Sequence, residues 1–112
     1  QLKGKLNGMA IRVPTPNVSL VDLSFNTREP VTKESINAVI TAAANGPLKG
    51  ILSTSDEPLV SIDLCGNPHS SIVDLELTDT QGTHFAKILS WYDNEWGFSN
   101  RMLTLTKLLS NV

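Results

Sequence analysis

The sequence is poor in cysteine and histidine, the usual ligands of structural zinc. It contains one cysteine, Cys65, and two histidines among 112 residues. A lone cysteine forms no internal disulfide and is typical of a reducing compartment, so we expect a cytoplasmic protein. Structural zinc sites use four ligands at recurring spacing, and Cys65 with His69, Asp63 and Asp74 does not supply such a set. We therefore expect no metal.

The single thiol still leaves two interpretations open. Cys65 could act as a nucleophile with His69 or His84, but this requires thiolate activation by a base that the fold must bring close. The alternative is a small buried thiol beside a hydrogen-bonded loop histidine, and the sequence favours it.

Long apolar runs, basic clusters and phosphate loops are also missing. No run approaches the roughly 18 apolar residues of a membrane span. The formal net charge is −2, and the nine lysines and arginines are scattered along the chain. We therefore expect neither a membrane nor a nucleic acid as partner. No glycine-rich phosphate loop occurs, so a nucleotide must be held mainly by something outside this sequence.

What remains is an ordinary globular composition with 40% apolar and 18% charged residues. Helical periodicity predicts helices over 33–45 and 95–111. Thr32 is the expected N-cap of the first helix and Gly46 its left-handed C-cap. We expect the apolar side of this helix to lie on a sheet, through Ile36, Val39, Ile40 and Ala43.

Alternation of apolar and polar residues predicts strands over 8–13, 18–27, 48–53, 59–64, 71–78 and 83–92. A hairpin turn is expected at 79–82. The resulting fold class is α+β, a mostly antiparallel mixed sheet with a covering helix and a C-terminal helix.

Arg12 is the first candidate binding residue. It is the lone charge in an apolar strand pattern and precedes a stiff Pro-Thr-Pro segment. A fixed guanidinium fork suits a phosphate or a carboxylate. The alternative is a salt bridge to Asp22 or Asp63, which the pattern alone favours.

The second candidate is the stretch 90–101, S-W-Y-D-N-E-W-G-F-S-N-R, between a predicted strand and a predicted helix. It holds both tryptophans and the only tyrosine. A polar centre between aromatic residues suits a ring-shaped ligand with polar edges. The alternative is an ordinary turn with an aromatic minicore, in which Trp91 and Trp96 are packing residues.

Two longer motifs resemble a known family. Residues 6–19 read L-N-G-M-A-I-R-V-P-T-P-N-V-S, and residues 91–101 read W-Y-D-N-E-W-G-F-S-N-R. Both closely resemble the glyceraldehyde-3-phosphate dehydrogenase family. Two shorter segments lie between these motifs in the family's order, G-P-L-K-G-I-L at 46–52 and H-S-S at 69–71. The resemblance therefore covers essentially the whole chain.

The resemblance implies an NAD-dependent phosphorylating enzyme of glycolysis, a homotetramer that uses a phosphorylated aldehyde and inorganic phosphate. In this family a cysteine of an S-C-T-T-N motif attacks the aldehyde and a histidine assists proton transfer. Neither motif is present here, so no catalytic residue is assigned and the chain alone is expected to be inactive.

The same resemblance implies a position within the enzyme. Residues 1–112 look like the C-terminal portion of the catalytic domain. The helix over 96–111 is expected to pack on an NAD-binding domain that this sequence does not contain. The first residue is Gln rather than Met, which also favours a processed product or a piece of a longer protein.

Three positions acquire roles from the motifs. Arg12 matches the arginine that binds the substrate phosphate, which reverses the preference for a salt bridge. Asn94 matches the asparagine that hydrogen-bonds the nicotinamide carboxamide of NAD. Phe98 stands where many members have a tyrosine near the nicotinamide, so the apolar contact is kept and the hydroxyl is lost. Cys65 lies outside the catalytic motif.

Other functions remain as alternatives. The segments N-P-H-S and N-E-W-G-F also resemble the erythrose-4-phosphate dehydrogenase branch. That branch favours release of the acyl group to water. A non-catalytic binding or assembly module is a second alternative, because the last helix has a broad apolar face. An independent Cys65 enzyme ranks lowest.

Overall fold

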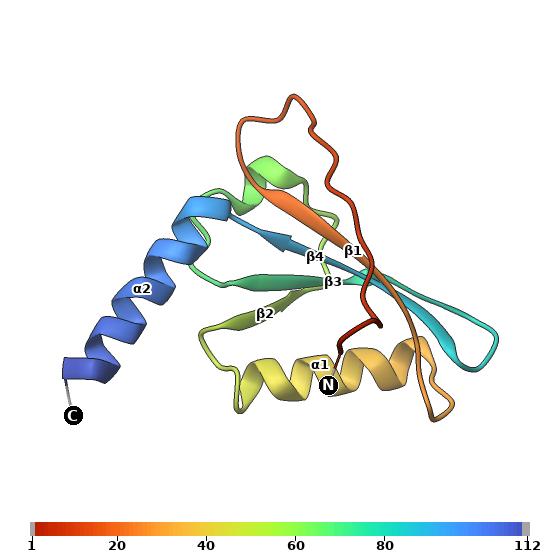
Figure 1. Ribbon diagram of the computed structural model, residues 1–112. Coiled ribbons are helices and arrows are strands. Elements are labelled where there is room, and N and C mark those ends of the chain that lie inside the picture. The colour runs from red at the N-terminus through yellow and green to blue at the C-terminus, as the bar shows by residue number, and fades with distance from the viewer. Residues whose placement is uncertain (1, 111–112) are drawn as a thin grey trace.

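The computed structural model of the protein describes residues 2–110, which form one sheet of four strands, two α-helices and a short 3-10 helix (Figure 1). The elements follow in the order β1 (Ser19–Asn26), α1 (Lys33–Asn45), β2 (Leu52–Ser55), η1 (Ser61–Leu64), β3 (Ser71–Gln81), β4 (Phe85–Tyr92) and α2 (Asn94–Ser110). The strand order is β1-β4-β3-β2, antiparallel except for the parallel β2–β3 pair. The predicted α+β class with a mixed, mostly antiparallel sheet is confirmed.

Strand β4 lies between β1 and β3 and ends at the junction with α2. The register runs from Ser19 opposite Tyr92 to Asn26 opposite Phe85. The start of β1 therefore lies beside the end of β4, although the two are far apart in sequence. This pairing positions the start of β1 next to the beginning of α2.

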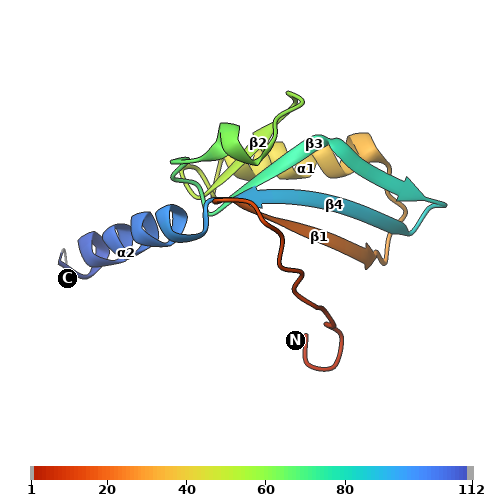
Figure 2. The ribbon, with the colours of Figure 1, turned by 90° about the horizontal axis from the view of Figure 1, so that it is seen from above.

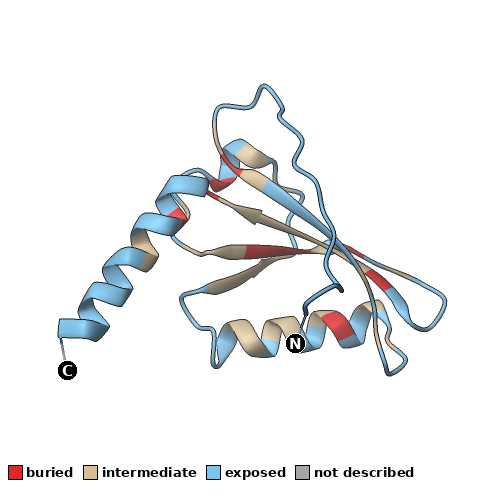
Figure 3. Cartoon of the chain, viewed as in Figure 1, coloured by how far each residue is buried: buried red, intermediate tan, exposed pale blue. Residues whose placement is uncertain are grey.

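A small apolar cluster closes this end of the sheet. Val18, Leu64 and Ile72 are its buried members, and Leu59 and Trp91 pack against it. Figure 3 shows that half of the buried residues lie in β3 and β4, whereas α2 is almost wholly exposed. The packing role predicted for Trp91 is confirmed, but Trp96 is 52% exposed, so the prediction that it packs was wrong.

Helix α1 begins as predicted. The Thr32 hydroxyl accepts a hydrogen bond from Ser35 N–H (3.2 Å), and Ser35 Oγ accepts one from Thr32 N–H (2.9 Å). Gly46 is the C-cap as predicted, but the expected left-handed conformation was wrong, because its φ is −116°. The chain instead turns through hydrogen bonds from Gly46 and Leu48 N–H to the Ala43 carbonyl.

The predicted apolar face of α1 is only partly covered. Ile36 is buried, but Val39 is 70% exposed. The helix packs mainly against β2 and β3. A cavity of about 460 Å³ therefore lies between α1 and β1, bordered by Phe25, Val39 and Ile88 among other apolar side chains. The expectation that Val39 lies on the sheet was wrong.

Two short predicted strands differ from the structure. Residues 59–64 contain η1 instead of a strand, because Asp63 accepts a hydrogen bond from Val60 N–H (2.9 Å) and closes a tight turn that buries Leu64. The strand expected over 48–53 begins only at Leu52, because the N–H groups of residues 51 and 52 both bond the Leu48 carbonyl.

The predicted hairpin turn at 79–82 is displaced toward the C-terminus. Residues 79–81 still belong to β3, the turn occupies 82–84, and β4 begins at Phe85. Gly82 adopts a φ of 66°, which glycine takes at little cost. An irregularity in the β3–β4 register between Asp74 and Asp79 lengthens β3 and moves the turn.

The strand expected over 8–13 is absent. Met9, Ile11 and Val13 are 60–88% exposed, and residues 2–16 make only local hydrogen bonds within the part of the chain that the structure describes. A strand needs a neighbouring backbone, and Pro14 and Pro16 lack the N–H groups that a direct hairpin with β1 would use. Figure 2 shows this segment leaving the sheet on its own.

Helix α2 projects away from the sheet (Figure 2). Its apolar stripe is 48–65% exposed, at Phe98, Met102, Leu105 and Leu109. The helix covers the predicted 95–111 range up to Ser110, and Asn111 lies outside the described residues. Among residues 2–110, neither helix has the length and apolarity that a membrane crossing requires.

Candidate functional site

The candidate site lies where β1 starts, β4 ends and α2 begins, and Asp93 is its central residue. Asp93 precedes α2 and is 3% exposed. Its Oδ2 accepts hydrogen bonds from Gly66 N–H (2.8 Å) and the Asn17 side-chain amide (2.9 Å), while its Oδ1 accepts one from Trp96 N–H (3.1 Å). One carboxylate thus joins three separate segments of the chain.

These donors determine the charge state of Asp93. The Gly66 N–H contributes most to holding the pKa of Asp93 below its ordinary value, with smaller contributions from Trp96 N–H and Asn17, while burial acts in the opposite direction. A carboxylate that accepts several hydrogen bonds is stabilised in its charged form. Asp93 is therefore an anion at neutral pH, and it caps the N-terminus of α2.

Asn94, the first residue of α2, is exposed and presents its carboxamide beside Ser19. The Ser19 hydroxyl lies 3.0 Å from Asn94 Oδ1 and 2.7 Å from Nδ2, so it can donate a hydrogen bond to the first or accept one from the second. An asparagine side chain has two N–H donors and an oxygen with two lone pairs. Whichever of the two contacts forms, at least one N–H and one lone pair remain for a ligand.

The residue before Ser19 has an unusual backbone. Val18 adopts a φ of 66°, although it is β-branched, and its side chain is 5% exposed in the apolar cluster. A β-branched residue at positive φ is an outlier that persists only when its surroundings hold it. The neighbouring side chains of Asn17 and Ser19 bond Asp93 and Asn94, so both sides of this turn are attached to the β4–α2 junction.

The first turns of α2 are fixed against two loops. Gly97 is buried so close to the loop before β3 that a Cβ there would lie 3.1 Å from the His69 carbonyl oxygen. Arg101 donates hydrogen bonds to the carbonyls of Gly50 (2.9 Å) and Pro68 (3.4 Å). Phe98, one turn beyond Asn94, is 65% exposed. Asn94 and Phe98 therefore stand on a rigid helix start and face outward.

Arg12 lies in the exposed segment before this site, and the structure does not join it to Asn94 directly. The salt-bridge alternative was wrong. Asp22 forms an ion pair with Lys87 (2.7 Å), which is the one ion pair within residues 2–110. Asp63 instead accepts a hydrogen bond from the Val60 N–H. The guanidinium is thus free for an external anion.

The structure also separates the residues of the Cys65 alternative. The thiol is exposed, which contradicts the expected burial, and its Sγ lies 3.9 Å from the Ser61 carbonyl. His69 pairs with Asn67 (2.8 Å) and His84 with the Thr27 carbonyl (3.2 Å), and neither histidine forms a hydrogen bond with Cys65 within the described residues. Within residues 2–110, no three ligand-type side chains gather to hold a metal ion.

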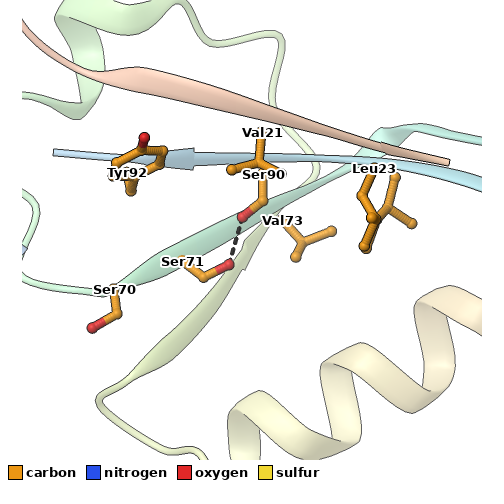
Figure 4. Close-up of a pocket in the computed structure, with 8 residues that line it drawn as sticks. Val21, Leu23, Ser70, Ser71, Val73, Ser90 and Tyr92 are labelled. Carbon is orange, nitrogen blue, oxygen red and sulfur yellow. Dashed lines mark hydrogen bonds between the residues drawn. The ribbon is translucent and has the colours of Figure 1, made fainter. Parts of the chain in front are cut away.

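A second concave feature lies on the face of the sheet. This cavity of about 180 Å³ is lined by apolar side chains of β1, β3 and β4 together with serine hydroxyls and Tyr92 (Figure 4). Ser71 and Ser90 share a hydrogen bond of 2.5 Å, and the buried Ser70 hydroxyl has no partner within the described residues. The lining carries no charged side chain, so the cavity suits an apolar surface better than an ionic ligand.

Sequence reasoning missed the residues that organise the main site. Asn17 and Ser19 were not among the candidates, and Asp93 was named only as part of the polar centre of the stretch 90–101, without its role as the shared acceptor. The usable signal was Asp93 directly before a predicted helix, where a short polar side chain caps the N-terminus. Nothing in the local sequence indicated that residues 17–19 lie beside it.

Comparison with known proteins identifies the family. Residues 1–94 match the family model for the glyceraldehyde 3-phosphate dehydrogenase C-terminal domain. The chain belongs to this family. A match over 94 of the 112 residues covers every strand of this dehydrogenase domain and the start of α2.

Relatives of this dehydrogenase domain include proteins of bacteria and of a plant. It is 56% identical over 102 residues to glyceraldehyde-3-phosphate dehydrogenase of Cereibacter sphaeroides, covering 91% of this chain and 31% of that protein. It is 54% identical over 112 residues to the chromosomal enzyme of Cupriavidus necator, covering 100% and 33%. The chloroplastic enzyme B of Pisum sativum is 51% identical over 112 residues, covering 99% and 25%. The chain thus spans about a third or less of the length of these curated relatives.

Proposed function

We propose that this chain is the C-terminal portion of the catalytic domain of an NAD-dependent, phosphorylating glyceraldehyde-3-phosphate dehydrogenase that works in cytoplasmic glycolysis. Family membership over residues 1–94 carries the proposal. The rest of the subunit supplies the reactive cysteine, its histidine partner and the NAD-binding domain. The present chain contributes contacts to the substrate phosphate and to the nicotinamide.

The residues of the junction fit one end of NAD. Asn94 offers a free N–H and a free lone pair, which complement a carboxamide, and Phe98 offers an exposed apolar ring one turn away. No glycine-rich phosphate loop is present within the sequence, so the rest of the dinucleotide is held elsewhere. Bound NAD would accept the hydride, while Asn94 and Phe98 orient the nicotinamide.

Arg12 is proposed to bind the phosphate of the aldehyde substrate. Its guanidinium is exposed and free of ion pairs, so it can form a two-pronged charge-assisted contact. The segment 8–13 keeps the alternation of a strand but has no partner within the described residues. We propose that the rest of the subunit supplies the neighbouring strand and so fixes Arg12.

We also propose that α2 packs on the NAD-binding domain, as the sequence predicts for the helix over 96–111. The exposed apolar stripe of α2 supports this. Large apolar patches on a soluble domain mark surfaces that a partner covers. The covering domain would also bring the dinucleotide to Asn94.

The test of this function is Arg12→Lys in the complete dehydrogenase subunit. Lysine keeps the charge but loses the fork, so we expect kcat/KM for the phosphorylated aldehyde to fall about 10- to 150-fold, which corresponds to one charge-assisted hydrogen bond. With glyceraldehyde, which lacks the phosphate, the change should stay within about threefold. Arg28→Lys, at another exposed arginine, is the matched control.

Equal losses of kcat/KM with both aldehydes would refute the proposal that Arg12 binds the phosphate. The same assay, run with erythrose 4-phosphate, decides between the two dehydrogenase branches. Higher kcat/KM for the four-carbon substrate, with release to water, would assign the chain to the erythrose-4-phosphate branch.

A second candidate function is subunit assembly. In the complete enzyme, this chain would take part in forming the homotetramer. Val21 and Leu23 are 44% and 41% exposed beside the sheet cavity, and this apolar face supports pairing between subunits. Sedimentation of the isolated chain discriminates between the candidates. A well-folded monomer at micromolar concentration would argue against an assembly module acting on its own.

A further inference from the structure

We propose that Ser19 is a positioning residue for Asn94, and that the turn at Val18 holds Ser19 in place. This inference rests on the proposed function, in which Asn94 binds the nicotinamide carboxamide. Ser19 lies within the motif 6–19, which gave it no role, and in this proposal it touches neither substrate nor cofactor itself.

The contact geometry determines what Ser19 can do. The terminal torsion of an asparagine side chain has a broad profile, so an unrestrained amide samples many orientations. Ser19 Oγ lies within hydrogen-bond distance of both amide heavy atoms, at 3.0 Å from Oδ1 and 2.7 Å from Nδ2. A hydroxyl can donate to Oδ1 or accept from Nδ2, and either hydrogen bond restrains the amide plane. The remaining N–H and lone pair of Asn94 then point in a fixed direction.

The backbone explains why Ser19 is available at this point. Val18 adopts a φ of 66° and buries its side chain against Leu64 and Ile72. Asn17, on the other side of Val18, bonds the buried Asp93 carboxylate, which lies next to Asn94 in sequence. Attachment on both sides and burial in the middle hold a conformation that a valine rarely adopts. This turn therefore fixes Ser19 relative to the start of α2.

The experiment uses the complete dehydrogenase subunit and measures NAD affinity by calorimetric titration without aldehyde. Ser19→Ala removes both contacts to the Asn94 amide, and we expect the Kd for NAD to rise about three- to tenfold. Ser19→Thr keeps the hydroxyl and should restore an affinity within about twofold of the original. Ser24→Ala, on the same strand, is the control, because the Ser24 hydroxyl is exposed and has no hydrogen-bond partner within residues 2–110.

Asn94→Ala separates this inference from the proposed function. If Asn94→Ala leaves NAD affinity unchanged, Asn94 has no nicotinamide role and both proposals fail. If Asn94→Ala weakens binding while Ser19→Ala does not, the positioning role alone is overturned.

The double variant tests the path through Asn94. Added to Asn94→Ala, the Ser19→Ala change should leave the Kd for NAD unaltered, because the group that Ser19 orients is gone. An equal loss in both backgrounds would show that Ser19 acts through the fold instead, and would refute the proposal. Melting temperatures of Ser19→Ala and Ser24→Ala should agree, since the contact lies at the surface.

Discussion

Replacing Asp93 by asparagine removes one negative charge from the centre of the site while keeping the shape of the side chain. Asp93 offers two acceptor oxygens to three donors, two on Oδ2 and one on Oδ1. Asparagine has a single acceptor oxygen and two N–H donors. In either orientation its amino group must face at least one of the donors from Gly66, Asn17 and Trp96.

The structure bounds the expected loss. A hydrogen bond to a charged group contributes about 1.5 to 3 kcal/mol, and a buried donor left without an acceptor costs about 1 to 3 kcal/mol. Asp93 is buried, but Asn17 is only half-buried, so solvent screens part of the interaction. We therefore expect Asp93→Asn to lower the free energy of unfolding by about 2 kcal/mol at pH 7, near the lower end of these ranges.

The effect must depend on pH in one direction. Hydrogen bonds keep the pKa of Asp93 in the folded protein below its ordinary value, and the bond from the Gly66 N–H contributes most. A lowered folded pKa contributes stability that is present above the unfolded pKa of about 3.9 and is lost as the pH falls through the folded value. The asparagine variant lacks this contribution at every pH. The difference between the two proteins should thus be constant from pH 7 to about pH 5 and shrink below pH 4.

Urea unfolding of the chain, followed by the fluorescence of Trp91 and Trp96, measures this difference between pH 7 and pH 3. Asp56→Asn makes the same charge change at an exposed carboxylate without a side-chain hydrogen bond within residues 2–110, and should stay within about 0.5 kcal/mol of the original protein. A loss for Asp93→Asn that matches Asp56→Asn, or that does not vary with pH, would refute the proposed role of the Asp93 carboxylate.

Two further predictions concern the helix starts. Thr32→Ala removes the acceptor of the Ser35 N–H and should lower the free energy of unfolding by about 1 kcal/mol in urea, whereas Thr32→Ser should restore most of it. Gly97→Val places a side chain against the His69 carbonyl, 3.1 Å from the position of a Cβ, and should cost about 1 to 3 kcal/mol of stability. Gly8→Val, where a Cβ meets no atom within 4 Å, is its control, and equal effects of the two would show that the loop can move aside.

The sequence alone predicted the elements that carry strong local signals. The helix at Lys33–Asn45 was predicted with its Thr32 cap, because capping and periodicity act within a few residues. The strands at 19–26, 71–81 and 85–92 also came close to their observed bounds. Local pattern failed at 59–64, where an Asp63 side chain closes a turn, and at 8–13, where no neighbouring strand is available.

The site was predicted only in part, for a physical reason. Asn94 and its helix start lie in one continuous motif and can be read from sequence. The partners of that motif, Asn17 and Ser19, reach it through the β1–β4 pairing, and no periodicity encodes which strands become neighbours. The positive φ of Val18 was equally hidden, because valine favours extended backbone elsewhere.

The β1–β4 pairing also dictates the order in which the domain can assemble during synthesis. The contacts between Asn17 and Asp93 and between Ser19 and Asn94 span 76 and 75 positions of the chain. At roughly 5 to 20 residues per second, β1 leaves the ribosome about 4 to 15 s before its partner exists. During that interval the apolar side chains of β1, among them Val21 and Leu23, have no neighbouring strand to pack against. The junction that orients Asn94 is therefore among the last parts of the domain to form.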